Sequence, residues 1–315
     1  MALATVCKII PNIRYFDVSM RDVSLSKTLP EKQIMIDTIM KKYKPHALEI
    51  GSPIQKITNS YKLYQYASTI YNKNSIYNRL MKSNMISHIY HPCDFYLLVP
   101  PIKKYINIAQ KLNIKNISLY TSIQNQSIQE TKANITNILK KKDKFDKFNK
   151  FDNVKLYVSC SLDIHNSGKK DIDNILNELY EYIELDGVNE ICISDTRRTM
   201  TQDDFIYIID NLSKNKDTMD KMDKISLQLH MNDGNGNGNG NGNSNGNGNS
   251  NGNGNSNGNI NNIIENIIEY ALINNIHKFN VSSLDNSNSN SNITSANGSK
   301  LTYEKLNTIL TDFYI

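Results

Sequence analysis

Short apolar runs alternate with longer amphipathic segments along almost the whole chain. The apolar runs are rich in Ile, Val, Leu, Tyr and Phe, a composition typical of β-strands. Eight runs predict strands, at residues 13–18, 46–51, 94–100, 114–121, 154–161, 189–195, 225–231 and 277–283.

The segments between these runs repeat their apolar residues with the period of an α-helix. They predict eight helices, at about residues 30–44, 58–72, 101–112, 127–142, 171–186, 201–214, 260–274 and 301–313. Pro30, Pro101 and Asp171 stand at the beginning of three of them, where proline and aspartate favour a helix start.

A strand followed by a helix, repeated eight times, predicts the fold. Once a Gly/Asn tract is subtracted, the eight units occupy about 290 residues, which is the size of an α/β protein of the (β/α)8 TIM-barrel type. We expect one such domain over residues 1–315, and a chain that is 39% hydrophobic can bury its core. A doubly wound open sheet is the alternative, although it does not usually need eight regular units.

Low-complexity stretches interrupt the pattern. Residues 234–258 form a Gly/Asn repeat that we predict to be a disordered insertion in the seventh strand-to-helix loop. A charged linker occupies 140–153, and a second Asn-rich stretch follows the eighth predicted strand. Both Asn-rich stretches fall in loops after strands, at the end of the barrel where such folds keep their chemistry.

Composition excludes several classes of partner. The net charge of +5 comes from lysines spread along the chain, without a basic stripe and interleaved aromatics, so solvated helix faces are favoured over nucleic-acid binding. No run of about 18 apolar residues predicts a membrane span, and the apolar run near the N-terminus is too short for a signal peptide. We expect a soluble, cytoplasmic protein. A homodimer is compatible with the sequence, which sets no oligomeric state.

The four cysteines do not have metal-binding or redox spacing. No CxxC pair occurs among them, and three lie in or beside apolar runs; they are Cys7, Cys93, Cys160 and Cys192. They are typical of reduced, mostly buried thiols.

Polar residues gather after four of the predicted strands. In a barrel these strand ends share one mouth, which we define as the end of the barrel where the strands finish. The residues are Arg21 and Asp22, Glu49, Asp195 and Thr196, and His230, Asn232 and Asp233. Oxygen and imidazole ligands suit Mg²⁺ or Mn²⁺, and a set without thiols argues against zinc. Residues 230 and 232 point to the same side of a strand, so both can reach one ion.

Each of these residues also has an ordinary structural explanation. Arg21 and Asp22 are compatible with a surface or helix-cap contact, Glu49 with an ion pair inside a barrel, and His230 with a simple hydrogen bond. Their joint placement at one mouth is what favours a site.

The order of the motifs resembles one family. The segment FDVSMRDVS is similar to the strand-one signature D-x-x-x-R-D-G of metal-dependent lyase and synthase barrels, which include 3-hydroxy-3-methylglutaryl-CoA (HMG-CoA) lyase and isopropylmalate synthase. Four later segments resemble further motifs of that family, in the same order, and the likeness runs from about residue 12 to 310. They are ALEIGSPI, KLYVSCSLD, EICISDTRRTMT and LQLHMND. The middle segments favour the lyase over the synthases.

The resemblance implies a set of roles. It makes Asp22, His230 and Asn232 ligands of a divalent metal, Mg²⁺ or Mn²⁺, and places Arg21 against the thioester carbonyl of an acyl-CoA substrate. Thr196 joins Arg21 in substrate binding, and Glu49 and Asp195 join it in catalysis. The implied reaction cleaves a 3-hydroxyacyl-CoA such as HMG-CoA to acetyl-CoA and acetoacetate.

Two departures from the family pattern leave a second hypothesis open. Asn232 stands where the family has a second histidine, and the cysteine of the family's glycine-rich GLGGCP loop is missing from residues 284–299. The alternative to an active lyase is therefore a catalytically decayed barrel, retained as a binding or scaffold protein.

Overall fold

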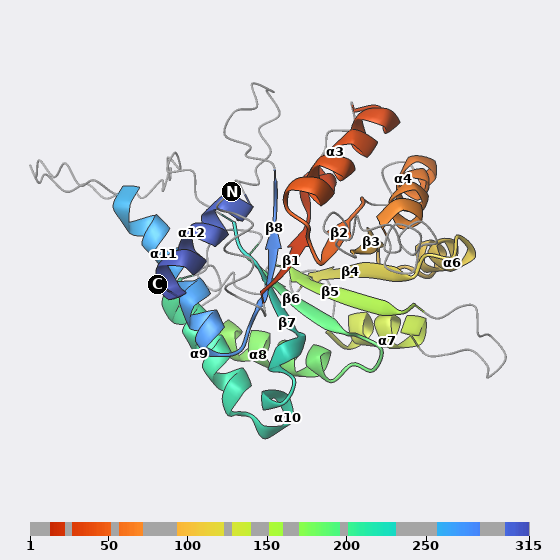
Figure 1. Ribbon diagram of the computed structural model, residues 1–315. Coiled ribbons are helices and arrows are strands. Elements are labelled where there is room, and N and C mark those ends of the chain that lie inside the picture. Colours follow the sequence, from red (N-terminus) through yellow and green to blue (C-terminus); the bar gives the residue numbers. More distant parts are fainter. Residues whose placement is uncertain are drawn as a thin grey trace, which may run out of the picture.

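The computed structural model describes ten segments of the chain: residues 13–22, 27–51, 57–71, 93–122, 128–139, 151–159, 170–195, 201–230, 257–283 and 300–314. Within them, eight parallel strands pair in chain order and the eighth pairs with the first, so that the sheet closes into a barrel (Figure 1). The strands are β1 (Arg14–Asp17), β2 (Ala47–Glu49), β3 (Asp94–Leu98), β4 (Asn116–Ser122), β5 (Asn153–Ser159), β6 (Glu190–Ser194), β7 (Ile225–Gln228) and β8 (Lys278–Val281).

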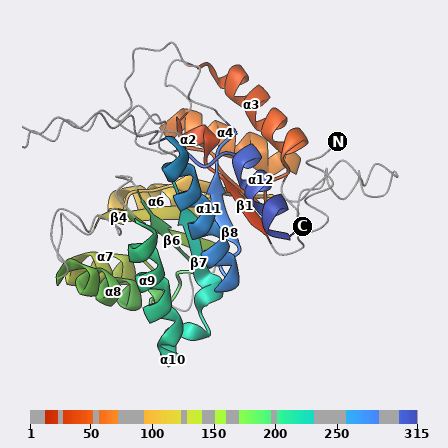
Figure 2. The same ribbon diagram turned by 90° about the vertical axis from the view of Figure 1, so that its left-hand side faces the viewer.

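Helices cover the outside of this barrel. In Figures 1 and 2, α11 lies between α9 and α12, and α3 packs beside α4. The eight longer helices are α3 (Leu29–Lys42), α4 (Ile57–Tyr71), α6 (Lys103–Lys111), α7 (Ile128–Leu139), α8 (Lys170–Ile183), α9 (Gln202–Lys214), α11 (Asn257–Ile273) and α12 (Tyr303–Tyr314). Three further elements are short turns of helix: α2 (Ser19–Asp22), α10 (Lys216–Met219) and η1 (Met222–Lys224).

Local sequence explains where several helices begin and end. Thr28 and Glu31 form a capping box at the start of α3, and Thr201 and Asp204 do the same for α9, so backbone N–H groups without a helical partner are satisfied there. Asn113 and Asn275 have positive φ angles of 53° and 62° just after α6 and α11. Asparagine tolerates this left-handed conformation, which ends a helix.

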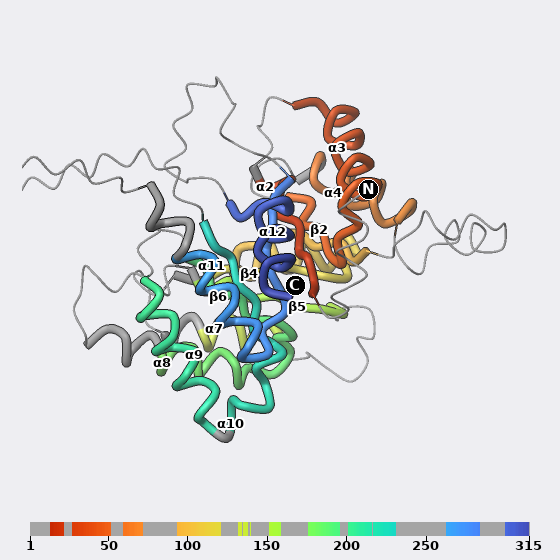
Figure 3. The backbone as a smooth tube through the Cα atoms, turned by 60° about the vertical axis from the view of Figure 1, so that its left-hand side comes forward, coloured from red at the N-terminus to blue at the C-terminus, as the bar shows by residue number. Residues whose placement is uncertain are grey.

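The two ends of the described chain meet where the barrel closes. Figure 3 shows β1 beside α12, and the hydroxyl of Tyr15 donates a hydrogen bond of 2.9 Å to Asn307. Residues 300–302 return to the mouth, where Ser282 donates to the carbonyl of Leu301 at 2.9 Å and Leu301 donates to Leu229 at 3.2 Å. The last helical unit is therefore tied to β7 and β8.

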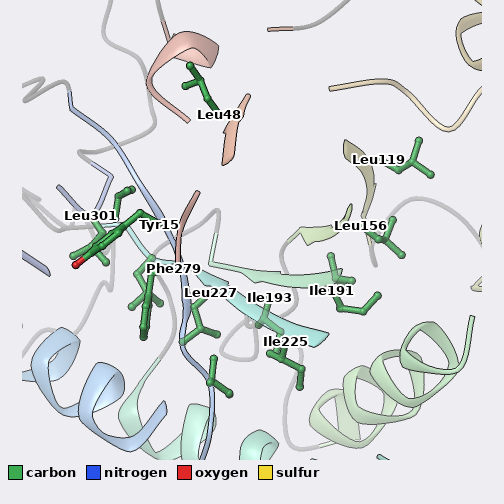
Figure 4. Close-up of a cluster of buried hydrophobic side chains, with 14 of the residues drawn as sticks. Tyr15, Leu48, Leu119, Leu156, Ile191, Ile193, Ile225, Leu227, Phe279 and Leu301 are labelled. Atoms are coloured by element: carbon green, nitrogen blue, oxygen red, sulfur yellow. The ribbon is translucent and has the colours of Figure 1, made fainter. Parts of the chain in front are cut away.

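The main hydrophobic core lies between the strands and the helices. Side chains at alternate strand positions point outward into it, because successive residues of a strand face opposite sides of the sheet. Figure 4 shows part of this layer, with Leu156 from β5, Ile193 from β6, and Leu227 and Phe279 from β7 and β8. At about 25 cal/mol per Å² of buried apolar surface, this layer is the main stabilising contribution to the barrel.

The inward positions of the strands are unusually polar. A small apolar cluster of Phe16, Val18, Ala47 and Tyr96 lies apart from the outer core. Beside it, Lys155 is fully buried, 2.6 Å from Glu190 and 2.6 Å from the amide oxygen of Asn280. A barrel interior is commonly filled by branched apolar side chains, so these charged and amide groups are a distinctive feature of the chain.

The predicted fold is confirmed. All eight strands and all eight helices form within a few residues of their expected bounds, and the closed strand order excludes the open-sheet alternative. Cys93 and Cys192 are buried free thiols as expected, whereas Cys7 and Cys160 lie outside the described residues.

The predicted low-complexity segments at 140–153 and 234–258 lie mostly outside the described residues, which include only their last few positions. The Gly/Asn tract lies outside the described residues, except that its last two residues, 257 and 258, already belong to α11. Strand β5 begins at Asn153, the last residue of the predicted charged linker. None of the helices in the described segments has the length and apolar character needed to cross a bilayer.

Candidate active site

Arg21 and Glu49 form the centre of the candidate site. The Nε atom of Arg21 donates to Oε1 of Glu49 at 2.6 Å, which joins the ends of β1 and β2. The Glu49 side chain is fully buried, whereas the Arg21 side chain is 22% exposed. The second carboxylate oxygen, Oε2 of Glu49, has no hydrogen-bond partner among the described residues. The pair therefore places a partly exposed guanidinium at the mouth, held by a buried carboxylate.

A buried aspartate holds the short helix that contains Arg21. Asp17 accepts a hydrogen bond of 2.7 Å from the backbone N–H of Ser19 and one of 2.8 Å from the hydroxyl of Tyr303. Burial raises the pKa of Asp17 to about 6, although both hydrogen bonds and the charge of Lys300 act in the opposite direction. The hydroxyl of Ser19 also accepts from the backbone N–H of Ser283 at 2.7 Å. Helix α2 is thus fixed to β1, β8 and α12.

His230 lies at the end of β7, at the same mouth. It is 9% exposed, and its Nδ1 atom lies 2.7 Å from the backbone carbonyl oxygen of Asp195. A carbonyl oxygen only accepts hydrogen bonds, so Nδ1 holds a proton, and in the neutral imidazole Nε2 holds the lone pair. This arrangement is typical of metal-binding histidines, whose second nitrogen donates to a carbonyl or carboxylate.

Lys300 pairs with His230 through a backbone bridge and is itself 7% exposed. A lysine ammonium has no lone pair, so Lys300 in its charged form cannot act as a metal ligand beside His230. Its charge acts instead on Asp17.

Two residues that sequence reasoning missed complete the surroundings of Arg21. Its guanidinium carbon lies 4.5 Å from the ring centre of Tyr157 in a cation–π contact, and its Nη1 donates to Oε1 of Gln228 at 3.3 Å. Tyr157 is fully buried, and burial raises the pKa of its hydroxyl well above the ordinary value, with the charge of Glu49 adding to the effect. The phenol is therefore neutral.

A signal for these residues was present in the strand patterns. Polar side chains alternate with apolar ones in β5, β7 and β8, at Lys155 and Tyr157, at Ser226 and Gln228, and at Asn280. In a barrel covered by helices, the apolar positions must face outward, so the alternating polar positions must face the interior.

Of the other predicted site residues, the structure describes the side chain of Asp195 but not those of the remaining four. Asp195 is described and buried, and its carbonyl orients His230. Asp22 ends α2, but its side chain lies outside the described part of the structure, as do Thr196, Asn232 and Asp233. Among the described side chains, no group of three or more His, Cys, Asp or Glu is arranged to hold a metal ion. The metal-ligand set Asp22, His230 and Asn232 stays a prediction.

The fold and the mouth place the chain among (β/α)8 barrels with polar groups at the strand ends. No family model matches the sequence, and no curated protein matches it. Solved structures do match. HMG-CoA lyase from Pseudomonas aeruginosa aligns with a TM-score of 0.62 and 14% identity, over 96% of this chain and 86% of the lyase.

Two further lyases give similar alignments. HMG-CoA lyase from Bacillus subtilis has a TM-score of 0.62 and 14% identity, covering 96% of this chain and 87% of its own. The enzyme from Acinetobacter baumannii, solved with coenzyme A and 3-methylmalate, has a TM-score of 0.57 and 14% identity over 95% and 83% of the two chains. At this identity the likeness shows the barrel fold alone.

Proposed function

We propose that the protein is a divalent-metal-dependent carbon–carbon lyase. It cleaves a 3-hydroxyacyl-CoA such as HMG-CoA to acetyl-CoA and acetoacetate. The observation that supports this most directly is Arg21, which is fixed at the mouth by Glu49, Tyr157 and Gln228. A rigid cation at this place suits a reaction in which negative charge develops on a thioester oxygen.

The described part of the metal site fits a divalent cation. His230 has the proton on Nδ1, so Nε2 is the nitrogen able to bind a metal, and its ring is held by the carbonyl of Asp195. Asp22 and Asn232 would supply oxygen ligands, which Mg²⁺ and Mn²⁺ accept. Such a cation, when bound, lowers the pKa of a coordinated hydroxyl group.

The reaction breaks the bond between C2 and C3 of the substrate. We assign Asp195 as the group that accepts the proton of the C3 hydroxyl, because Glu49 is engaged with Arg21. The C3–O electrons then form the ketone of acetoacetate, and the electron pair of the C2–C3 bond passes into the thioester as an enolate. Arg21 stabilises the enolate oxygen, and protonation of C2 gives acetyl-CoA.

An acyl-CoA substrate is supported by two observations. The sequence motifs resemble those of a CoA-dependent lyase, and one structure that matches this barrel was solved with coenzyme A. Thr196 is the proposed neighbour of Arg21 in substrate binding.

The alternative function is a decayed barrel that binds a ligand without turnover. It is favoured by the absence of cysteine from residues 284–299 and by Asn232 in the place of a histidine. A positioned general acid is typically worth ~10²–10⁴ in rate, so loss of the cysteine predicts slow protonation of the enolate.

The test is to incubate the protein with HMG-CoA and Mn²⁺ or Mg²⁺ and to measure acetoacetate and acetyl-CoA. We expect both products in equal amounts, with loss of release in Arg21→Gln. Arg14→Gln is the matched control, since Arg14 is exposed at the start of β1. An acyl-CoA that raises the melting temperature without product release would instead support the binding protein.

A further inference from the structure

A continuous line of polar contacts crosses the barrel interior from Lys155 to Arg21. Lys155 donates to Oδ1 of Asn280 at 2.6 Å, and Nδ2 of Asn280 donates to Oε1 of Gln228 at 3.2 Å. The same Oε1 accepts from Nη1 of Arg21 at 3.3 Å. Lys155, Asn280 and Gln228 are 0%, 1% and 3% exposed, so water contributes little to these contacts.

Lys155 is a fixed donor at the inner end of this line. Its ammonium lies 2.6 Å from Glu190 and 3.6 Å from the ring centre of Phe16. Burial acts to raise the pKa of Glu190, but the charge of Lys155 and the hydrogen bonds outweigh it, and the pKa lies below the ordinary value. Glu190 is therefore ionised at neutral pH.

Lys155 and Arg21, at the two ends of the line, determine how the amide groups between them are oriented. Lysine and arginine side chains donate hydrogen bonds and cannot accept them. Asn280 must therefore turn its oxygen to Lys155 and its NH₂ group to Gln228. Gln228 must in turn present its oxygen both to Asn280 and to Arg21. Reversing either amide would place two donors against each other.

Asn280 also reaches Arg21 by a second route. Its Nδ2 atom donates to the hydroxyl of Tyr157 at 3.0 Å, and the ring of Tyr157 lies 4.5 Å from the guanidinium carbon of Arg21. One amide thus holds both the hydrogen-bond acceptor and the aromatic ring that support the same cation.

We infer that Asn280 and Gln228 are positioning residues that fix the guanidinium of Arg21 for an anionic thioester oxygen. The role in catalysis rests on the proposed function, whereas the positioning itself rests on these contacts alone. Neither residue needs to touch the substrate.

Two isosteric substitutions separate positioning from packing. Asn280→Asp keeps the size but replaces the NH₂ donor by an acceptor, so Gln228 must turn its own NH₂ group toward the carboxylate and hence toward Arg21. Gln228→Glu keeps an acceptor for both neighbours, whereas Gln228→Met keeps only the volume. If Gln228 positions Arg21, Gln228→Glu should be tolerated better than Gln228→Met. If Gln228 only fills space among apolar groups, Gln228→Met should be tolerated better.

The readout is the exchange rate of the Arg21 Nη1–H protons, which face Gln228, by nitrogen-15 NMR, with the signal assigned by its loss in Arg21→Lys. We expect roughly 10–100-fold faster exchange in Asn280→Asp and Gln228→Met, as for a lost hydrogen bond to a charged group, and little change in Gln228→Glu. Asn116→Asp is the matched control, because Asn116 is a buried strand asparagine whose hydrogen bonds to Phe95 and Asn153 lie outside this line.

Two outcomes would overturn the inference. One is equal acceleration in Asn280→Asp and Asn116→Asp, and the other is faster exchange in Gln228→Glu than in Gln228→Met. Acetoacetate release is measured in parallel, and there we expect kcat to fall more than KM rises. If the exchange pattern holds but the unmodified protein releases no acetoacetate, the positioning stands and the proposed lyase reaction fails.

Discussion

Arg21 and Glu49 are joined by a hydrogen-bonded ion pair, 2.6 Å long, between the ends of the first two strands. The two residues are 28 positions apart in the sequence, and the parallel pairing of β1 with β2 brings them together. The glutamate is buried and neutralises part of the charge of the arginine, while the arginine stays accessible from the mouth.

Glu49→Gln should reduce turnover more than stability. The amide can still accept a hydrogen bond from Arg21, but it removes the charge that holds the guanidinium, and a misplaced catalytic group can cost about 100-fold in rate. The measurement is acetoacetate release per folded protein. Glu184→Gln removes an exposed pair with Lys221 and serves as the control. Equal activity of the two variants would contradict the role of Glu49.

Asp22→Ala should abolish Mn²⁺ binding while the barrel remains folded. The prediction follows from the proposed ligand set of Asp22, His230 and Asn232, in which the aspartate is the only charged ligand. Isothermal titration with Mn²⁺ measures the binding, and circular dichroism checks the fold. Asp186→Ala, at an exposed turn after α8, is the control. Undiminished binding by Asp22→Ala would place the ion elsewhere.

Asp17→Asn should remove a pH dependence of stability. The pKa of Asp17 is raised from 3.8 to about 6 by burial, so the folded state holds a proton that the unfolded state releases between these values. The contribution of Asp17 to the free energy of unfolding therefore falls as the pH rises from about 4 to 6. The asparagine cannot ionise, but it retains an acceptor for the backbone N–H of Ser19.

Denaturant unfolding of both proteins at several pH values measures this effect. The stability of Asp17→Asn relative to the natural chain should increase by about 2 kcal/mol between pH 4 and pH 7, because this range covers most of the ~3 kcal/mol that a shift of this size represents. A difference that does not change with pH would show that Asp17 ionises with an ordinary pKa.

Replacing residues 234–256 by a short Gly/Ser linker should leave stability nearly unchanged. The replacement stops before Asn257 because α11 begins there. The free energy of loop closure depends only on the logarithm of loop length, so shortening the loop should alter unfolding by only about 1 kcal/mol. The measurement is the melting temperature. A fall of many degrees would mean that the repeat packs against the barrel.

Local patterns in the sequence were sufficient to predict the barrel. Each strand and each helix is specified by its own apolar period, as in β5, where Val154, Leu156 and Val158 alternate with other residues. Eight such units in the right order leave few ways to bury their apolar faces. For the same reason the sequence could place Arg21, Glu49, Asp195 and His230 at one mouth, because parallel strands finish at the same end.

Only the tertiary structure decided which polar groups touch. Lys155, Asn280 and Gln228 stand on three different strands, and nothing local to any of them indicates a shared hydrogen-bond line. Their contacts depend on the register and curvature of the closed sheet, which set the depth of each side chain inside the barrel. The tautomer of His230 is likewise determined by a carbonyl 35 residues away, at the end of the neighbouring strand β6. Periodicity is a property of one segment, whereas a hydrogen bond between strands is a property of their packing.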